Sequence, residues 1–527
     1  MADLSLPPST IISKNRIALA SLLFLFLYWL FGFDGITFSD DVYYLLAGRD
    51  FWNGEMEVND YHFSSRWGAY IPAGLLINLF GMNPQLASLS SLLYILSSYL
   101  LIISLITDRK ESWIFSLWFI TPVYFLHFIT KVYPDTLLVL CVSLVAWASV
   151  RRKKQGISSG ILMSLAFFIG MVTKETMVLL ALFPLILFFM DLKRKDLNQN
   201  FYFSLILTGI ILLSAYLGYF WLKFGDPLYR IQSINAGHYI SEFTYADKGW
   251  ARIVQRITYL PILTFIERAY WPWIVFALPG IVAGLQDSRR GLQEFSLAFL
   301  CLLLGFWFMT STLEVYNPIY LNPRHLIILI PLLSFLIGSS WKLWVASLFW
   351  KRLLTFLLIF GAIVSIYQGD LKMSFFHFGF VLVIWIKASF WKQALLVILL
   401  IVPAIYVIQY QKQLKEYPLL VQKLNEEAKN TSNQTPILTN NFLVFSREIV
   451  LADQKEAQNR LTPIEEIEVL KQTNPKHLKV FIYRYYHHAY PKEEEDVEKI
   501  ETWLKENYRK VEEMDLGQIW IRKFEKK

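Results

Sequence analysis

Charged residues are scarce in this chain, and their scarcity excludes an ordinary soluble protein. Of its 527 residues, 17% are charged and 55% are hydrophobic, and the mean hydropathy is +0.40. Soluble domains carry roughly 25% charged residues. The deficit indicates that lipid rather than water surrounds much of the protein.

Cysteine is also rare, and nucleotide-binding motifs are missing. The two cysteines, Cys141 and Cys301, lie inside apolar runs, which excludes a disulfide framework and a cysteine zinc site. The sequence contains no phosphate-binding glycine-rich loop and no dinucleotide fingerprint. We therefore expect no cytosolic nucleotide-sugar or ATP site.

Long apolar runs are abundant, and they predict a polytopic α-helical membrane protein. A span needs about 20 apolar residues, or fewer where the bilayer thins. The first run has no small-residue cleavage site after it, so we expect it to be retained as a span. The predicted spans, about 13 in number, are 16–33, 86–106, 112–130, 135–150, 158–173, 176–191, 201–222, 271–286, 294–312, 324–341, 353–367, 374–391 and 393–410. The apolar segment 67–82 contains Pro72 and is predicted to be interfacial or re-entrant.

The distribution of lysine and arginine predicts the orientation. Basic residues gather in loops on the side of the N-terminus, as in Arg151–Lys154 and Lys193–Lys195, and are few in the opposite loops. Cytoplasmic loops carry the excess of positive charge. We expect a multi-pass protein of the cell (inner) membrane with a cytoplasmic N-terminus. The net charge of +8 then reflects orientation, and no nucleic-acid partner is expected.

Two domains are predicted. Residues 1–410 form the transmembrane domain, with a first external loop at 34–85 and a large external loop at 223–270. The composition turns polar from residue 411, so 411–527 is predicted to be a small extracytoplasmic α/β domain. Within it, 478–483 and 519–521 are predicted strands, and 496–508 is a predicted helix.

Adjacent carboxylates in the first external loop are the main chemical signal. Asp40 and Asp41 follow the first span, where a carboxylate can act as a general base or bind a divalent cation. Alternatively, Ser39 and Asp40 only cap a helix over 41–52. Because Asp40 is the better cap, we favour Asp41 as the base, although either residue of the pair remains a candidate.

Other ionisable residues are expected at the same external face. Asp135 opens the fourth span, where it either begins a helix or joins the first-loop carboxylates. Lys174 and Arg324 could hold a lipid-linked phosphate. Alternatively, Lys174 only solvates a turn or pairs with a nearby Asp, and Arg324 only snorkels to the interface. Weaker candidates for acceptor or sugar contacts are Glu175, His325 and Glu242. No metal ligand set can be assigned, and the only candidate cofactor is a divalent cation.

In their order along the chain, these motifs resemble the GT-C membrane glycosyltransferases. The closer resemblance is to the protein mannosyltransferase and aminoarabinose-transferase group, glycosyltransferase family 39 in the broad sense. It covers roughly residues 10–340 well and the last three spans loosely. The matching segments are Asp40-Asp41, a short helix entered by Gly68–Pro72 and closed by Leu79–Gly81, Pro134-Asp135, Thr173–Glu175 and Pro323–His325.

The resemblance implies a GT-C-like bundle and an activity. Such enzymes transfer a sugar from a polyprenyl-phosphate carrier to an acceptor hydroxyl on a lipid, glycan or protein, outside the cytoplasm and usually with inversion. It implies that Asp40 or Asp41 is the base, that Asp135 orients the acceptor or assists the base, and that Lys174 and Arg324 hold the donor phosphate. Many relatives have Asp-Glu where this chain has Asp-Asp.

A transporter or lipid flippase is the alternative function. Ionisable residues near the middle of spans would favour it, because such residues line substrate routes. The candidates here gather at span ends instead, and the sequence has no inverted repeat. The sequence therefore favours sugar transfer.

Overall fold

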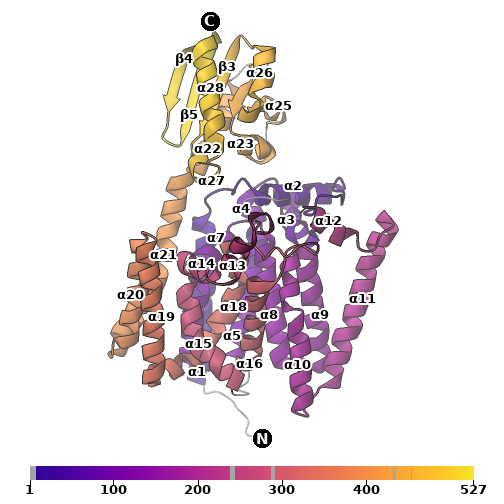
Figure 1. Cartoon of the computed structure of the whole chain (residues 1–527), viewed down its shortest axis with the longest axis vertical. Helices are drawn as coiled ribbons and strands as arrows, with labels where there is room; N and C mark the ends of the chain where they lie inside the picture. The colour runs from indigo at the N-terminus through magenta and orange to yellow at the C-terminus, as the bar shows by residue number, and fades with distance from the viewer. Residues whose placement is uncertain (1–7, 238–243, 287–290, 431–434, 453) are drawn as a thin grey trace.

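Long apolar helices form one bundle, and a small sheet stands above one end of it (Figure 1). The computed structural model describes all residues except 1–7, 238–243, 287–290, 431–434 and 453. We call the end of the bundle nearest the sheet the sheet-side end; α1 begins at the opposite end.

The long helices follow the apolar runs of the sequence. The first half of the chain forms α1 (Pro8–Gly32), α5 (Leu89–Leu105), α6 (Arg109–Ile120), α7 (Val123–Ile129), α8 (Pro134–Arg151), α9 (Gly156–Thr173), η1 (Glu175–Leu180), α10 (Leu182–Lys193) and α11 (Gln199–Phe224). The second half forms α15 (Trp271–Gln286), α16 (Leu292–Phe308), α17 (Pro323–Leu326), η3 (Ile327–Leu329), α18 (Ile330–Ala346), α19 (Leu348–Tyr367), α20 (Leu371–Trp385) and α21 (Ser389–Lys415).

The protein is a polytopic helical membrane protein, as the sequence predicts. Among the described residues, nine helices are long and apolar enough to cross a membrane, or up to eleven if two bent pairs each count as one span. These pairs are α6 with α7, bent by 68°, and α14 with α15, bent by 112°. The predicted number of about 13 is higher because it includes α16 and α20, which have only 17 and 15 residues.

Burial separates the central helices from the peripheral ones. α8 and α18 are buried along most of their length, whereas few residues of α11 are buried. The aromatic core includes Trp118 of α6, whose ring centroid lies 4.9 Å from that of Trp273 and 5.5 Å from that of Phe380. The exposed leucine, isoleucine and phenylalanine side chains of α11 match a lipid-facing surface.

Short helices cover the sheet-side end (Figure 1). They are α2 (Asp40–Asn53), α3 (Trp67–Phe80), α4 (Pro84–Ala87), α12 (Tyr229–Gly237), η2 (Ala246–Lys248), α13 (Trp250–Ile257) and α14 (Leu260–Glu267). α3 has 14 residues, is not among the helices long enough to cross a membrane, and packs on α2. The segment 67–82 is thus no full-length span, and its interfacial or re-entrant position stays a prediction.

Two glycines set the distance between α2 and α3. A Cβ atom on Gly48 would lie 2.6 Å from the carbonyl oxygen of Tyr70, and one on Gly74 would lie 2.2 Å from the carbonyl oxygen of Gly48. Real Cβ atoms do not approach backbone atoms this closely. The two helices therefore cross where neither backbone carries a side chain, and this crossing seats α2 at the sheet-side end.

The C-terminal region forms a five-stranded mixed sheet in the order β2-β1-β3-β5-β4. β1 is parallel to β2 and β3, whereas β5 is antiparallel to β3 and β4. The strands are β1 (Ile437–Thr439), β2 (Leu461–Pro463), β3 (His477–Tyr483), β4 (Tyr508–Asp515) and β5 (Ile519–Lys526). Its helices are α22 (Tyr417–Lys429), α23 (Asn441–Phe445), α24 (Arg447–Val450), α25 (Lys455–Gln458), η4 (Ile464–Glu466), α26 (Ile467–Thr473), α27 (Tyr486–Ala489) and α28 (Glu493–Asn507).

The predicted strands at 478–483 and 519–521 and the predicted helix at 496–508 are confirmed in position. The change in composition at residue 411 falls inside a helix, because α21 continues to Lys415. We call residues 437–526 the sheet unit.

Candidate functional site

Asp41 is buried and turned into its own loop. Its carboxylate accepts hydrogen bonds from the backbone N–H of Thr37 at 2.6 Å, from the Thr37 hydroxyl at 2.7 Å and from the backbone N–H of Ser39 at 3.1 Å. Because the Thr37 hydroxyl donates its one hydrogen to Asp41, the Tyr133 hydroxyl, 2.6 Å away, donates to Thr37. Asp41 thus holds the turn into α2.

Asp40 points instead toward a cation from a distant part of the chain. Its carboxylate lies 3.0 Å from a guanidinium nitrogen of Arg324, and it keeps some exposure. The interpretation of Asp40 as a helix cap is wrong: Ser39 has the capping position, no side chain makes a capping hydrogen bond there, and α2 begins at Asp40. The pair therefore contains one carboxylate that organises the loop and one that faces other residues.

Four of the predicted site residues meet in one ion-pair cluster. Asp135 lies 2.7 Å from the Lys174 ammonium through one oxygen and 3.4 Å from Arg324 through the other. Arg324 contacts Asp40 as well. The structure thus connects Asp40, Asp135, Lys174 and Arg324, which come from α2, α8, the break between α9 and η1, and α17.

Local sequence places each cation. Lys174 is extended between α9 and η1, so its side chain leaves the helix and reaches Asp135 at the start of α8. Arg324 lies in the first turn of α17, where the Asn322 side chain accepts a hydrogen bond from its backbone N–H at 3.0 Å. The guanidinium of Arg324 also lies 4.6 Å from the centre of the Tyr133 ring. Such a contact favours the charged arginine.

Glu175 belongs to a second ion-pair group next to the first. It lies 2.8 Å from Arg66 and 3.1 Å from Arg230, and Arg66 also donates to the hydroxyl of Tyr44 at 3.0 Å. Burial alone would lower the pKa of Arg66, but the adjacent Glu175 carboxylate outweighs burial and raises that pKa. Glu175 is therefore occupied by two arginines.

Sequence reasoning missed Arg66, Arg230 and Tyr133. Arg66 stands in an aromatic stretch of the first loop and Arg230 in the large loop, and each resembles an ordinary interfacial arginine. Both arginines contact Glu175 at the start of η1, which is far from each of them in sequence. No local signal in the sequence distinguishes them.

The remaining predicted residues do not join the ion-pair cluster. His325 follows Arg324, and the buried Nδ1 of its ring has no hydrogen-bond partner among the described residues. Glu242 lies outside the described residues.

The charges of the two groups leave an excess of one positive charge. The cations are Lys174, Arg324, Arg66 and Arg230, and the carboxylates are Asp40, Asp135 and Glu175. Burial, strengthened by nearby Arg324 and Arg66, lowers the pKa of Lys174 to about 8, although Asp135 acts in the opposite direction. An anion with one charge would balance the excess and would favour protonated Lys174.

A divalent cation remains only a candidate. Among the described residues, no group of three or more histidine, cysteine or carboxylate side chains is placed to hold a metal ion. Asp41 accepts hydrogen bonds from its loop, and Asp40 and Asp135 face arginine and lysine. This carboxylate arrangement fits an anionic ligand better than a metal.

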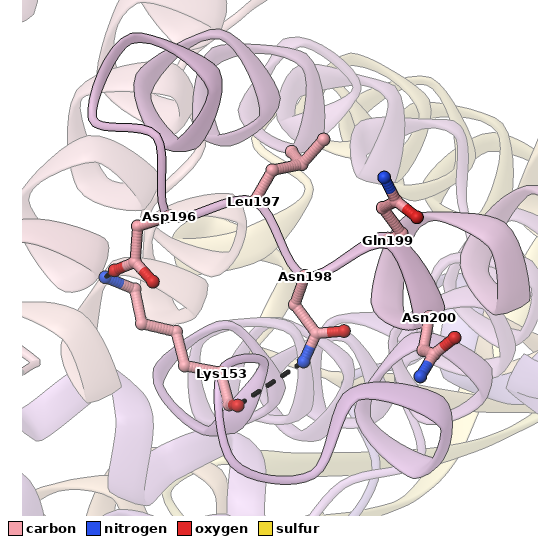
Figure 2. Close-up of a pocket in the computed structure, with 6 residues that line it drawn as sticks. All are labelled: Lys153, Asp196, Leu197, Asn198, Gln199 and Asn200. Atoms are coloured by element: carbon pink, nitrogen blue, oxygen red, sulfur yellow. Dashed lines mark hydrogen bonds and ion pairs between the residues drawn. The ribbon is translucent and has the colours of Figure 1, made fainter.

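A surface pocket lies between the end of α8 and the turn that joins α10 to α11, at the end of the bundle away from the sheet (Figure 1 and Figure 2). Its residues differ from those of the ion-pair cluster. It lies where Lys153 and Asp196 form an ion pair, and the Asn198 side chain donates to the backbone carbonyl of Lys153 at 3.3 Å. The other lining residues are Leu197, Gln199 and Asn200. The carboxylates of α2 and α8 do not line this pocket.

The helical bundle with the sheet unit above one end is the fold of a multi-spanning membrane protein. Solved structures share this fold. ArnT from Cupriavidus metallidurans bound to undecaprenyl phosphate matches with a TM-score of 0.61 and 12% identity, over 96% of this chain and 97% of that one. The apo form of the same protein matches with the same TM-score and identity, over 97% of each chain. The archaeal oligosaccharyltransferase AglB from Archaeoglobus fulgidus, in complex with an inhibitory peptide and a dolichol-phosphate, has a TM-score of 0.43 and 12% identity, over 89% of this chain and 69% of that one.

The chain therefore has an ArnT-like fold, and the predicted fold class is confirmed. Sequence comparison is less informative. Residues 71–274 match a family described as a domain of unknown function, DUF8201. No curated protein matches the sequence.

Proposed function

We propose that this protein transfers a sugar from a polyprenyl-phosphate carrier to an acceptor hydroxyl at the sheet-side end of the bundle, which faces away from the cytoplasm. The observation that carries this proposal is Arg324, which touches Asp40 and Asp135 together while Lys174 lies on the far oxygen of Asp135. A candidate base thus adjoins two candidate phosphate ligands. The solved ArnT structure with a similar fold was bound to undecaprenyl phosphate.

The reaction assigns a separate task to each charge. The acceptor oxygen attacks the anomeric carbon, and its proton passes to a carboxylate base. The bond between that carbon and the phosphate oxygen breaks, and its electron pair leaves with the lipid phosphate. Lys174 and Arg324 stabilise the charge that develops on that phosphate. Attack opposite to the leaving group inverts the anomeric configuration.

Asp40 is the better base of the pair. A base must come within hydrogen-bond distance of the proton that it removes. Asp41 is buried and already accepts hydrogen bonds from Thr37 and Ser39, whereas Asp40 is partly exposed and has Arg324 as its partner. This assignment differs from the preference for Asp41 that the sequence suggested.

Arg324 couples donor binding to the base. In the protein alone, the guanidinium of Arg324 occupies the Asp40 carboxylate, so this oxygen is not free to accept a hydrogen bond from an acceptor hydroxyl. A bound phosphate competes for the same guanidinium, because arginine binds phosphate well. The donor then frees Asp40 for the acceptor. Asp135 holds both cations in place during the exchange.

Mass spectrometry of envelope glycans tests the proposal in the host. Cells that lack the gene are complemented with wild type, Asp40→Asn or Asp50→Asn, each shown to reach the membrane at equal level. Asp50 is a matched control, because it is a carboxylate of the same helix whose partner is Arg49. We expect a sugar to disappear without the gene and to return with wild type and Asp50→Asn only. Full return with Asp40→Asn would refute Asp40 as base, and no glycan change would favour transport.

A further inference from the structure

The turn between α1 and α2 is held by contacts from the sheet unit, from the end of α21 and from Lys131 before α8. It comprises residues 33–39 and ends one residue before Asp40. Two of its residues have left-handed backbone conformations: Gly35 with φ of 94° and Phe38 with φ of 60°. For a bulky residue such as Phe38 this backbone conformation is strained, so surrounding contacts must enforce it.

The sheet unit supplies contacts to Phe38. The Tyr490 hydroxyl donates to the backbone carbonyl of Phe38 at 2.7 Å. The Phe38 ring is buried edge-on against Phe442 and Tyr483, with centroid distances of 5.2 Å and 5.8 Å. Tyr490 stacks on Phe442 at 4.7 Å. The strained residue is thus fixed by both its carbonyl and its ring.

The last residue of α21 holds the first part of the turn. The buried ammonium of Lys415 lies 2.9 Å from Asp34 and donates to the carbonyl of Ile36 at 3.1 Å. Asp34 also pairs with buried Lys131, which precedes α8. The Tyr483 hydroxyl donates in turn to the backbone carbonyl of Lys415. Removing one partner from such a buried group leaves the others uncompensated.

These contacts lead directly to the carboxylate pair. The backbone N–H groups of Thr37 and Ser39, on either side of Phe38, both donate to Asp41. Their direction depends on the Phe38 backbone between them. Asp41 in turn fixes the first turn of α2, and thereby the position of Asp40, the first residue of that helix.

We propose that the sheet unit and the end of α21 together position Asp40, and that Tyr490 of the sheet unit and Lys415 of α21 are the positioning residues. The proposal rests on the assignment of Asp40 as the base. A packing interface alone would bury the aromatic rings. Here two polar side chains also fix backbone carbonyls of the turn that carries the candidate base. A small displacement of a reacting group costs much of the rate, so this support acts on the chemical step.

The experiment compares Tyr490→Phe with Tyr508→Phe in the full-length protein. Tyr508 is the matched control, because its hydroxyl donates to the carbonyl of Pro475 at 2.9 Å within the sheet unit and away from the turn. Each variant loses one hydroxyl that is bonded to a backbone carbonyl. We measure steady-state transfer from an undecaprenyl-phosphate sugar and amide hydrogen exchange of a peptide that covers residues 34–45.

We expect Tyr490→Phe to lower kcat about tenfold while KM for the donor stays within about twofold, since the base moves and the phosphate ligands do not. Exchange of this peptide, which contains the Thr37 and Ser39 amides, should rise in this variant alone. Equal kcat losses in both variants would overturn the proposal, because they would indicate general weakening of the sheet unit. Unchanged exchange in Tyr490→Phe would overturn it too. If the wild type transfers no sugar, the proposed function fails, and the exchange comparison still decides whether Tyr490 holds the turn.

Discussion

At the residue scale, two adjacent aspartates have different surroundings. Asp41 is enclosed by donors of its own turn, whereas Asp40 contacts an arginine from the other half of the chain. The sequence indicates that this pair is important because two adjacent carboxylates follow the first predicted span in an external loop. It cannot assign the roles, because these depend on the backbone direction at Phe38 and on where Arg324 arrives.

The lowered pKa of Lys174 predicts that the proposed use of the donor depends on pH. Burial lowers its pKa to about 8, and only the protonated amine carries the charge that binds phosphate. We therefore expect kcat/KM for the donor to be full below that pH and to fall above it, by up to about tenfold per pH unit. A pH profile of initial rates measures this.

Lys174→Arg is the control for that profile, because arginine stays charged throughout the range. The decline near pH 8 should disappear in this variant, whatever its absolute rate. A decline that stays at the same pH would show that another group titrates.

At the scale of elements, the crossing of α2 and α3 seats Asp40. A methyl group at Gly48 would push against the backbone of Tyr70 and Gly74. We expect Gly48→Ala to cost about 1–3 kcal/mol and to lower the melting temperature of the purified protein, because the helices must separate.

Gly218→Ala in α11 is the comparison, since a Cβ atom there would contact no other atom within 4 Å. This variant should keep the wild-type melting temperature or exceed it slightly, because alanine favours a helix. Equal melting temperatures for both variants would contradict the tight crossing.

Some helices and strands can be predicted from local sequence patterns, and others cannot. Apolar runs place the long helices, and alternation places β3, because both patterns are local. The thirteen predicted spans exceed the nine to eleven candidate spans found among the described residues. Composition alone does not reveal where a helix ends early, as in α20, or bends, as between α6 and α7. The arginines on Glu175 were missed because their pairing is set by tertiary structure.

At the scale of the whole molecule, the sheet unit lies at the same end of the bundle as α2 (Figure 1), and α2 begins with the carboxylate pair. Basic loops crowd the other end, which predicts that the shared end lies outside the cytoplasm. Labelling of intact cells with a membrane-impermeant maleimide tests this. The variants carry Val511→Cys in β4 or Lys154→Cys after α8, both exposed, in a protein whose native cysteines are replaced.

We expect Val511→Cys to be labelled in intact cells, and Lys154→Cys only after the membrane is opened, because the reagent cannot cross the bilayer. Labelling of Lys154→Cys alone in intact cells would reverse the orientation and would place the proposed reaction in the cytoplasm.

The most direct test of the proposed function is release of undecaprenyl phosphate by the purified protein. Undecaprenyl-phosphate hexoses and pentoses are supplied one at a time with a detergent extract of the host envelope as acceptor, and the released lipid phosphate is measured by mass spectrometry. We predict release by wild type and Asp50→Asn, and release about 10²–10⁴-fold slower by Asp40→Asn, because the general base is lost. Release at the wild-type rate by Asp40→Asn, or no release from any of these donors, would contradict the account.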